Sequence, residues 1–385
     1  MKRMHVAFCL EQQYGHIVPT LGIALELIRR GHRVSYAVIA AFAPLIRRID
    51  AMTALIDPFD TRAEVLGTVL RKNDCVSYNR DEVAVQRVAE LSRERTGRSL
   101  AQLESVYRDD MPDVIVHDDV FDTAGRTLAQ AKGLPKIRLQ SQFIDRDDPA
   151  FRPTQYDDDE MILVTVPKFF QRNHEHFAGD RRFEFVGFIP EGRALAFAPW
   201  SRRQGHARPI LASATTGMLP QLEYCRTLLD AFRGRHYEVV LAISASLDRA
   251  SDIDPALLGE LPPNIEVNRF AGNFQILEAA RLFIGQGGQG ATLEAIYWGV
   301  PQIVVPPTPY HNRVALRVSE LGLGTCLPIS EMSPARIRSE VTTLLEDREA
   351  ADRAQSAGHS MRNARGAALA ADLIEAHFAG HGSRP

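Results

Sequence analysis

The sequence is poor in cysteine, and its cysteines follow no metal-binding or redox pattern. There are four, at Cys9, Cys75, Cys225 and Cys326, and no two of them form a C-x-x-C pair. No group of histidines and cysteines has the spacing of a zinc site. The sequence therefore predicts neither a structural metal nor a disulfide framework, and a reducing, cytoplasmic setting fits best.

Long hydrophobic runs and an excess of one charge are also missing. No stretch of about 18 apolar residues occurs in the chain, so we expect no membrane span. The first residues, Met1–Phe8, pass directly into a strand pattern and lack the apolar core and cleavage site of a signal peptide. A formal net charge of −3 gives no support for a nucleic-acid or anionic-membrane partner.

What the sequence does contain is strands alternating with helices, in two successive halves. An apolar run at His5–Leu10, a helical period over Thr20–Arg30 and a second run at Arg33–Ile39 predict a right-handed β-α-β unit. The same alternation restarts at Ile210–Ser213 and continues to Gln302–Val305. Since strands that alternate with helices form parallel sheets, we expect an α/β fold with two doubly wound, Rossmann-like domains.

Composition along the chain predicts the domain boundaries. Residues 1–190 form the first domain, and residues 191–209, which contain Gly, Pro and Arg without a clear period, form a linker. Residues 210–360 form the second domain, and the Ala-rich tail, residues 361–385, is helical and is expected to return to the first domain. Because ligands of such folds bind at the carboxyl ends of the strands, we expect both domains to face a central cleft.

The strongest motif runs from a strand through a glycine-rich turn into a helix, over Phe283–Ala295. Glycine permits positive φ angles and a close approach of the backbone. A helix that begins at such a turn presents free N–H groups and a partial positive charge, which together form an anion site. The motif predicts a diphosphate site, although the same glycines also suit a tight turn with no ligand.

Two further stretches sharpen this interpretation: a Gly-Val-Pro turn at Gly299–Pro301 and the glycines of Leu321–Gly324. With them, the motif resembles the donor-binding signature of the UDP-glycosyltransferase superfamily, in the style of the bacterial natural-product glycosyltransferases of the antibiotic and macrolide type. The resemblance covers about residues 265–325 well and extends weakly over most of the chain, including Gly15–Pro19. It implies a GT-B architecture and the transfer of a sugar from a nucleoside diphosphate to a small hydrophobic acceptor.

The resemblance also implies which residues act in the first domain. His16 matches the family's catalytic base in the G-H-x-x-P motif, and Asp118 matches the carboxylate that orients it. A neutral imidazole can take the proton of the acceptor hydroxyl, and a carboxylate on the far ring nitrogen fixes its tautomer. Without the resemblance, His16 is a polar turn residue and Asp118 a strand-end cap, and Asp119 competes for the role of Asp118.

In the second domain the resemblance implies a donor site. Glu294 matches the glutamate that binds the ribose hydroxyls, and Phe270 takes the place of the tryptophan that stacks on the base. Without the resemblance, Glu294 is an ordinary surface residue of a helix and Phe270 a core residue. Ser213 and Thr216 lie where relatives place hydroxyls near the phosphates. The other expected donor-binding residues are Gln286, Gly287, Gly288, Gly290, Ala291, Thr292, Tyr310 and His311.

Three elements of the family pattern are altered. Gln286 replaces a histidine that donates to the diphosphate, and an amide still donates a hydrogen bond but cannot become cationic. Tyr310 and His311 replace an acidic residue and a glutamine that hold the hydroxyls of the donor sugar, so the acidic acceptor is missing. The third departure is the family's W-x-P-Q stretch, which reads Phe270-Ala271-Gly272-Asn273 in this sequence. Either the donor is unusual, or its affinity is weak, or the donor half has lost its function.

The predicted reaction is an inverting single displacement that needs no metal and no cofactor, onto a hydroxyl of a polyketide- or macrolide-like acceptor. UDP-glucose is the default donor, and a dTDP-deoxysugar is the main rival. The departures leave open a second class, a catalytically impaired GT-B homologue that serves as activator or scaffold for a partner enzyme. A nucleotide-sugar epimerase and a lipid-linked glycosyltransferase are further alternatives, whereas the single glycine after the first strand disfavours a dehydrogenase. The sequence predicts neither the identity of the individual acceptor nor the oligomeric state.

Overall fold

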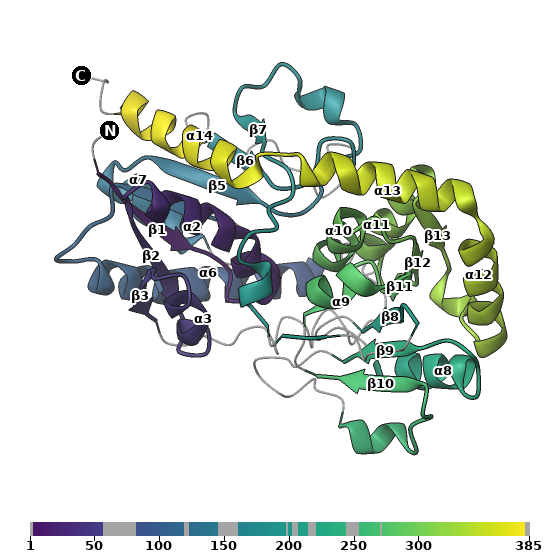
Figure 1. Ribbon diagram of the computed structural model, residues 1–385. Coiled ribbons are helices and arrows are strands. Elements are labelled where there is room, and N and C mark those ends of the chain that lie inside the picture. Colours follow the sequence, from purple (N-terminus) through teal and green to yellow (C-terminus); the bar gives the residue numbers. More distant parts are fainter. Residues whose placement is uncertain are drawn as a thin grey trace. The chain divides into compact units, whose positions relative to one another are not determined.

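The chain forms two compact units in a computed structural model (Figure 1). Of the residues described below, the first unit comprises those up to Ala196 together with those from Ala364 onward, and the second comprises those from Phe197 to Asn363. The structure describes residues 3–56, 82–118, 123–144, 161–197, 199–201, 207–214, 221–243, 254–269 and 272–381.

A parallel sheet of seven strands, in the order β3-β2-β1-β4-β5-β6-β7, is the base of the first unit. The order reverses between β1 and β4, which pair directly, with Cys9 opposite His117. Ligands of such sheets bind at the carboxyl ends of the strands, at the point of reversal. The elements of this unit are β1 (His5–Cys9), α1 (Tyr14–Ile17), η1 (Val18–Thr20), α2 (Leu21–Arg29), β2 (Arg33–Val38), α3 (Ala43–Arg47), β3 (Met52–Leu55), α6 (Glu82–Val106), β4 (Val114–His117), α7 (Ala124–Lys132), β5 (Lys136–Gln140), β6 (Met161–Val164), η3 (His174–Phe177), β7 (Phe183–Phe185), η4 (Arg193–Leu195) and α14 (Gly366–His381).

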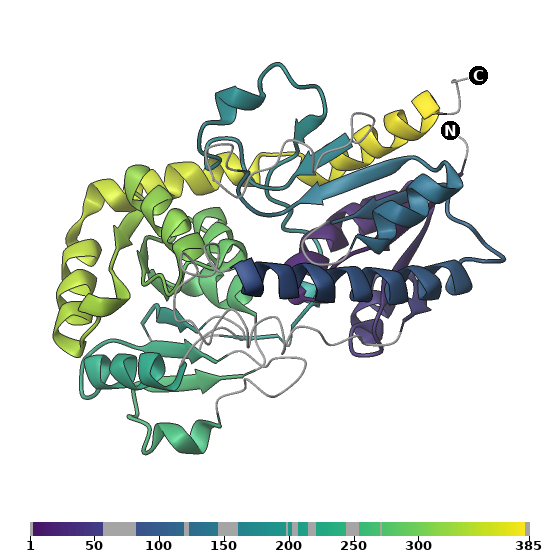
Figure 2. The same ribbon diagram turned by 180° about the vertical axis from the view of Figure 1, so that it is seen from behind.

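Both faces of this sheet are buried. Ala7 and Cys9 of β1 pack in one cluster with Leu128 of α7 and Leu103 of α6, two helices that lie side by side in Figure 2. Phe8 points to the opposite face, where its ring stacks on Tyr36 of β2 at 4.7 Å and α2 contacts β2. Burial on both faces explains why β1 is a continuous apolar run and not an alternating one.

The second unit repeats the arrangement with six parallel strands, in the order β10-β9-β8-β11-β12-β13. The reversal lies between β8 and β11. Ile210 and Ala212 of β8 pack in a cluster with residues of α8 and α12, and Leu211 packs on the other face with residues of α9 and α10. The elements are β8 (Ile210–Ser213), α8 (Gln221–Phe232), β9 (Val239–Ala242), η5 (Pro255–Leu258), β10 (Ile265–Asn268), α9 (Asn273–Ala279), β11 (Leu282–Gly285), α10 (Gln289–Tyr297), β12 (Gln302–Val304), α11 (Pro309–Glu320), β13 (Gly324–Cys326), η6 (Ile329–Glu331), α12 (Pro334–Glu346) and α13 (Arg348–Arg362).

The predicted α/β class is confirmed, and the differences lie at element ends and sheet edges. Helix α10 begins at Gln289, inside the glycine-rich motif, although the low helix propensity of Gly290 favours a later start. The edge strands β3, β7 and β13 are not predicted. The residues of β3 are exposed or half-buried, and β7 and β13 have three residues each, so none shows a strong apolar run. Among the helices described, none is both long and apolar enough to cross a membrane.

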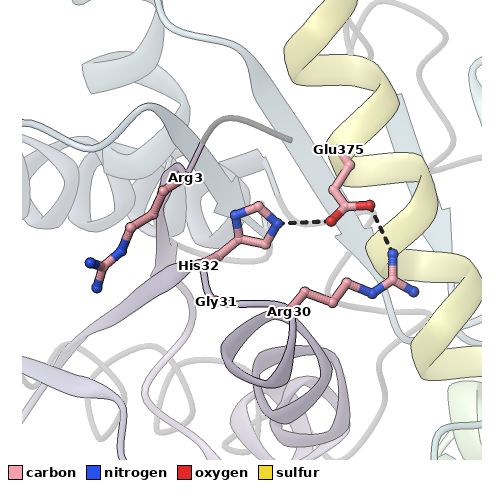
Figure 3. Close-up of a pocket in the computed structure, with 5 residues that line it drawn as sticks. All are labelled: Arg3, Arg30, Gly31, His32 and Glu375. Carbon is pink, nitrogen blue, oxygen red and sulfur yellow. Dashed lines mark hydrogen bonds and ion pairs between the residues drawn. The ribbon is translucent and has the colours of Figure 1, made fainter.

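The C-terminal helix α14 packs against α2 through a buried carboxylate. Glu375, only 7% exposed, accepts hydrogen bonds from Nε2 of His32 and from the guanidinium of Arg30, each at 2.8 Å (Figure 3). Nδ1 of His32 accepts from the backbone N–H of Met4 at 3.3 Å, so Nε2 is its donor atom. Arg30 also pairs with the half-exposed Asp372 at 2.6 Å. Glu375, His32 and the half-buried Arg30 line, with Arg3 and Gly31, a polar hollow of about 490 Å³.

We expect Glu375→Ala to destabilise the first unit, because it leaves His32 without its acceptor and removes the buried carboxylate from Arg30. The free energy of unfolding should fall by about 2–3 kcal/mol. Asp372→Ala removes a partner of the same arginine at an exposed position and should cost less than about 1 kcal/mol. Differential scanning calorimetry on both variants measures the difference, and equal losses would contradict the role given to Glu375.

Candidate functional site

The loops after β1 and β4 bring two predicted residues together in the first unit. His16 lies in the short helix α1, seven residues after β1 ends, and Asp118 directly follows β4. Because β1 and β4 are neighbours with their carboxyl ends at the same edge, residues that are 102 apart in sequence come into contact. The contact therefore lies where the strand order reverses.

His16 and Asp118 form a buried, hydrogen-bonded pair. Nδ1 of His16 lies 2.7 Å from Oδ2 of Asp118, and the two residues are 7% and 5% exposed. Oδ1 of Asp118 accepts from the backbone N–H of Glu11 at 2.9 Å, so both carboxylate oxygens are held. A carboxylate beside Nδ1 places the proton of the neutral ring on that nitrogen and leaves Nε2 as a proton acceptor.

A second charged pair lies beside the first. Glu11 is 3% exposed, and its Oε1 accepts from the guanidinium of Arg95 of α6 at 2.7 Å. Burial raises the pKa of Glu11, and Arg95 opposes this rise. Burial lowers the pKa of His16, but Asp118 and then Glu11 raise it, so the net pKa is above its ordinary value. Sequence reasoning missed Glu11 and Arg95, because no motif contains them.

In the second unit, the reversal between β8 and β11 brings Ser213 beside the glycine-rich turn. Ser213 ends β8, and the preceding Ala212 pairs with Ile284 of β11. Oγ of Ser213 accepts a hydrogen bond from the side-chain amide of Asn273 at 3.1 Å. Ser213 thus lies at the edge of the sheet from which the turn departs.

The turn has the backbone geometry that its glycines predict. Gly287 has φ +80°, a conformation that L side chains rarely adopt, and a Cβ atom there would lie 2.7 Å from the carbonyl oxygen of His311. Gly288 is the N-cap of α10 and offers no side-chain cap, so the first backbone N–H groups, which include those of Gly290 and Ala291, point out of the helix end. This end carries a partial positive charge suited to an anion.

Tyr310 and His311 lie in α11 against this turn. The Tyr310 hydroxyl donates to Oε1 of Gln289, the first residue of α10, at 2.9 Å. Nδ1 of His311 lies 2.6 Å from Oγ1 of Thr308, the N-cap of α11. Burial lowers the pKa of His311 to about 4, so its ring is neutral at neutral pH. The two residues therefore present hydrogen-bonding groups and no charge.

The remaining predicted donor residues lie on or near α10. Gln286 follows β11 and is buried, and Thr292 and Glu294 are buried in α10. Glu294 is thus not the exposed helix residue that its position would otherwise suggest. Phe270, Thr216 and the competing candidate Asp119 lie outside the described residues. Gln289 is a polar neighbour of the turn that sequence reasoning missed, since it occupies the variable position of the glycine-rich motif.

Comparisons with known proteins agree with this arrangement. Residues 226–374 match the family described as erythromycin biosynthesis protein CIII-like, C-terminal domain. The chain is 29% identical to the NDP-glycosyltransferase YjiC of Bacillus subtilis (strain 168), over 98% of either chain. It is also 29% identical to the demethyllactenocin mycarosyltransferase of Streptomyces fradiae, over 96% of this chain and 86% of that one. The calicheamicin glycosyltransferase CalG4 superposes with a TM-score of 0.77 at 27% identity, covering 98% of this chain and 99% of that one.

The chain is a GT-B glycosyltransferase of the bacterial natural-product type. The resemblance inferred from the glycine-rich motif and the GT-B fold are both confirmed. The roles of individual residues in this glycosyltransferase stay predictions.

Two glycine substitutions distinguish the need for glycine in the turn from the need for glycine in the first turn of α10. Gly287→Ala places a methyl group against the His311 carbonyl and requires a left-handed conformation, so it should destabilise the second unit by about 1–2 kcal/mol or more. Gly290→Ala adds a methyl group that meets nothing within 4 Å, so its effect should range from neutral to stabilising by up to about 1 kcal/mol. Thermal unfolding of the two variants checks this, and equal melting temperatures would contradict the strained role of Gly287.

Proposed function

We propose that this glycosyltransferase moves a sugar from a nucleoside diphosphate sugar to a hydroxyl of a small, hydrophobic natural-product acceptor, with inversion at the anomeric carbon. The observation that supports it best is the buried His16–Asp118 pair, which leaves Nε2 as a proton acceptor beside a fixed carboxylate. This is the arrangement of a general base with its orienting group.

The proposed step is one displacement. Nε2 of His16 takes the proton of the acceptor hydroxyl while the hydroxyl oxygen forms a bond to the anomeric carbon. The bond from that carbon to the diphosphate oxygen breaks, and the diphosphate leaves with the electron pair. Asp118 stabilises the imidazolium that results, since its carboxylate is 2.7 Å from Nδ1.

In this proposal the leaving diphosphate lies at the N-terminus of α10. Backbone N–H groups and the helix dipole there stabilise the negative charge that develops on the leaving group. The mechanism assigns no step to a metal or a cofactor. Gly290→Ala supplies a test, because a methyl group at the second residue of α10 should weaken nucleotide binding without lowering the melting temperature of the free protein.

The donor base and sugar are less closely defined. UDP-glucose is the first candidate, and a dTDP-deoxysugar is the second. The second is favoured by the neutral pair Tyr310 and His311, which offers no carboxylate to hydroxyl groups of a sugar. A catalytically impaired scaffold protein is disfavoured, because the His16–Asp118 geometry is intact and the relatives are named glycosyltransferases.

A thermal-shift panel of UDP, dTDP and GDP, each with its common sugars, tests the donor assignment. A nucleotide at about 100 times its dissociation constant adds about 2.7 kcal/mol to the stability of a protein that binds it only when folded. If nucleotides of one base shift the melting temperature, that base identifies the nucleotide of the donor. The enzyme is then supplied with sugar donors of that nucleotide and a panel of hydroxylated polyketide and macrolide acceptors. Mass spectrometry then detects the product as an acceptor whose mass has increased by that of one sugar. The absence of any shift would count against the donor site.

We expect His16→Ala to lower the rate of transfer by about 10²–10⁴-fold, the usual contribution of a general base. Asp118→Asn should also lower it, because an amide cannot stabilise the imidazolium. Both variants should bind the donor nucleotide with unchanged affinity, since neither residue belongs to the second unit. Initial rates with titration calorimetry check both statements, and a His16→Ala enzyme with parental turnover would remove His16 from the mechanism.

The rate should also depend on pH in a defined direction. Transfer needs neutral His16, whose pKa is above its ordinary value of 6.5 because Asp118 and Glu11 outweigh burial. The rate should therefore rise with pH through this raised pKa and fall below it. A profile of kcat against pH that is flat from mildly acidic to mildly basic conditions would contradict the assignment.

A further inference from the structure

The buried pair Glu11 and Arg95 lies next to the proposed base but has no place in the reaction described above. Glu11 occupies the loop between β1 and α1, two residues past the last residue of β1. Arg95 comes from the long helix α6, which joins β3 to β4 in the sequence. The two are 84 residues apart, and both are at least nine-tenths buried. Burying two charges is costly, so a pair retained in this position calls for an explanation beyond stability.

Glu11 is connected to the His16–Asp118 pair in two ways. Its backbone N–H donates to Oδ1 of Asp118 at 2.9 Å, which fixes the carboxylate whose other oxygen holds His16. Its side chain adds a second negative charge close to the imidazole. Oε2 of Glu11 is buried and has no hydrogen-bond partner among the described residues, so only one of its two oxygens is neutralised by direct contact.

Arg95 influences the protonation state of Glu11. A carboxylate with one unsatisfied buried oxygen favours protonation, and the guanidinium at 2.7 Å from Oε1 favours the ionised form. Glu11 and Arg95 act on His16 in opposite directions, and Glu11 has the larger influence. Among the described residues, Asp118, Glu11 and Arg95 are charged groups with a large influence on the pKa of His16.

We propose that Glu11 and Arg95 are positioning residues that set the basicity of His16. Glu11 holds Asp118 through its backbone and supplies a second negative charge, and Arg95 keeps that charge ionised and limits its effect. This proposal rests on the role of His16 as the base. It adds a charged pair, from the β1–α1 loop and from a helix distant in the sequence, that adjusts the basicity of this base.

Glu11→Gln is the informative substitution. It preserves the length of the side chain, an oxygen that accepts from Arg95, and the backbone N–H that holds Asp118. It removes the negative charge and leaves the positive charge of Arg95 to act alone, so the acid limb of the kcat profile should move to lower pH. The ratio of variant to parental kcat should be about threefold higher or more near pH 5.5 than near pH 8.

The double variant Glu11→Gln, Arg95→Gln separates charge from structure. It removes Glu11, which raises the pKa of His16, together with Arg95, which lowers that pKa by less. The acid limb of its kcat profile should therefore lie between those of the parent and of the single variant. A purely structural pair predicts instead that the double variant is at least as defective as the single one, with an unmoved limb. Should the single variant fail to fold, the double variant still tests the proposal, because its limb must lie below that of the parent.

Matched controls come from an exposed pair on the same helix. Glu94 and Arg98 form a surface ion pair at 3.2 Å, with more than half of each side chain exposed. Glu94→Gln and Arg98→Gln repeat the two chemical changes away from His16 and should leave the pH profile unchanged. Melting temperatures of all variants show whether a lost activity reflects unfolding.

Histidine side-chain NMR titration distinguishes this proposal from the proposed function. The His16 resonance is assigned by its loss in His16→Ala, and its midpoint is followed in the parent, Glu11→Gln and the double variant. A midpoint that falls in both variants supports the proposal whether or not His16 is the base. Midpoints and kcat profiles that coincide with the parental ones would overturn it, whereas an active His16→Ala enzyme would instead overturn the catalytic role of His16.

Discussion

The parallel sheet is the constraint on which both candidate sites depend. When all strands run in one direction, every loop that follows a strand leaves from the same edge, and the strand order then decides which loops are neighbours. In the first unit the reversal brings the loop after β1 beside the residue after β4, and a hydrogen bond of 2.7 Å between His16 and Asp118 becomes attainable. In the second unit the same reversal brings Ser213 beside the turn after β11. One topological rule thus places reactive groups that the sequence holds far apart.

The candidate sites of the two units differ in their charged groups. The difference fits the two parts of the proposed reaction, proton removal from the acceptor and departure of the diphosphate. In the first unit, two buried carboxylates and one guanidinium surround an imidazole, an environment that favours accepting a proton. In the second unit, the groups that contact the turn and the first residue of α10 include neutral ones: an uncharged His311, a hydrogen-bonded tyrosine and the backbone N–H groups of α10. A backbone site attracts an anion without holding it as tightly as a lysine would, which suits a diphosphate that must leave.

The sequence predicts features that are local or that match a known motif. It does not predict contacts between residues that only the tertiary fold brings together. The inner strands of both sheets and the positive φ of Gly287 follow from apolar runs and glycines within a few residues, whereas the edge strands β3, β7 and β13 do not. His16 and Asp118 are found only through the resemblance, because nothing in the residues between them indicates their contact. Arg95 is invisible for a related reason: it is one of several charged residues of α6, and only the fold shows that its face, with Ser99 and Leu103, is the buried one.

The departures from the family pattern have a structural consequence that a residue-by-residue comparison does not show. The side chain of His311 contacts Thr308, the N-cap of α11, and its carbonyl oxygen lies 2.7 Å from where a Cβ atom on residue 287 would be. Tyr310 is tied to the first residue of α10 through Gln289. Because α10 begins at the turn, a change at positions 310 or 311 alters the support of the anion site as well as the groups offered to a donor. Tyr310 and His311 are thus connected to the turn itself, so reverting either one alone to the family's residue should disturb the turn before it restores a contact.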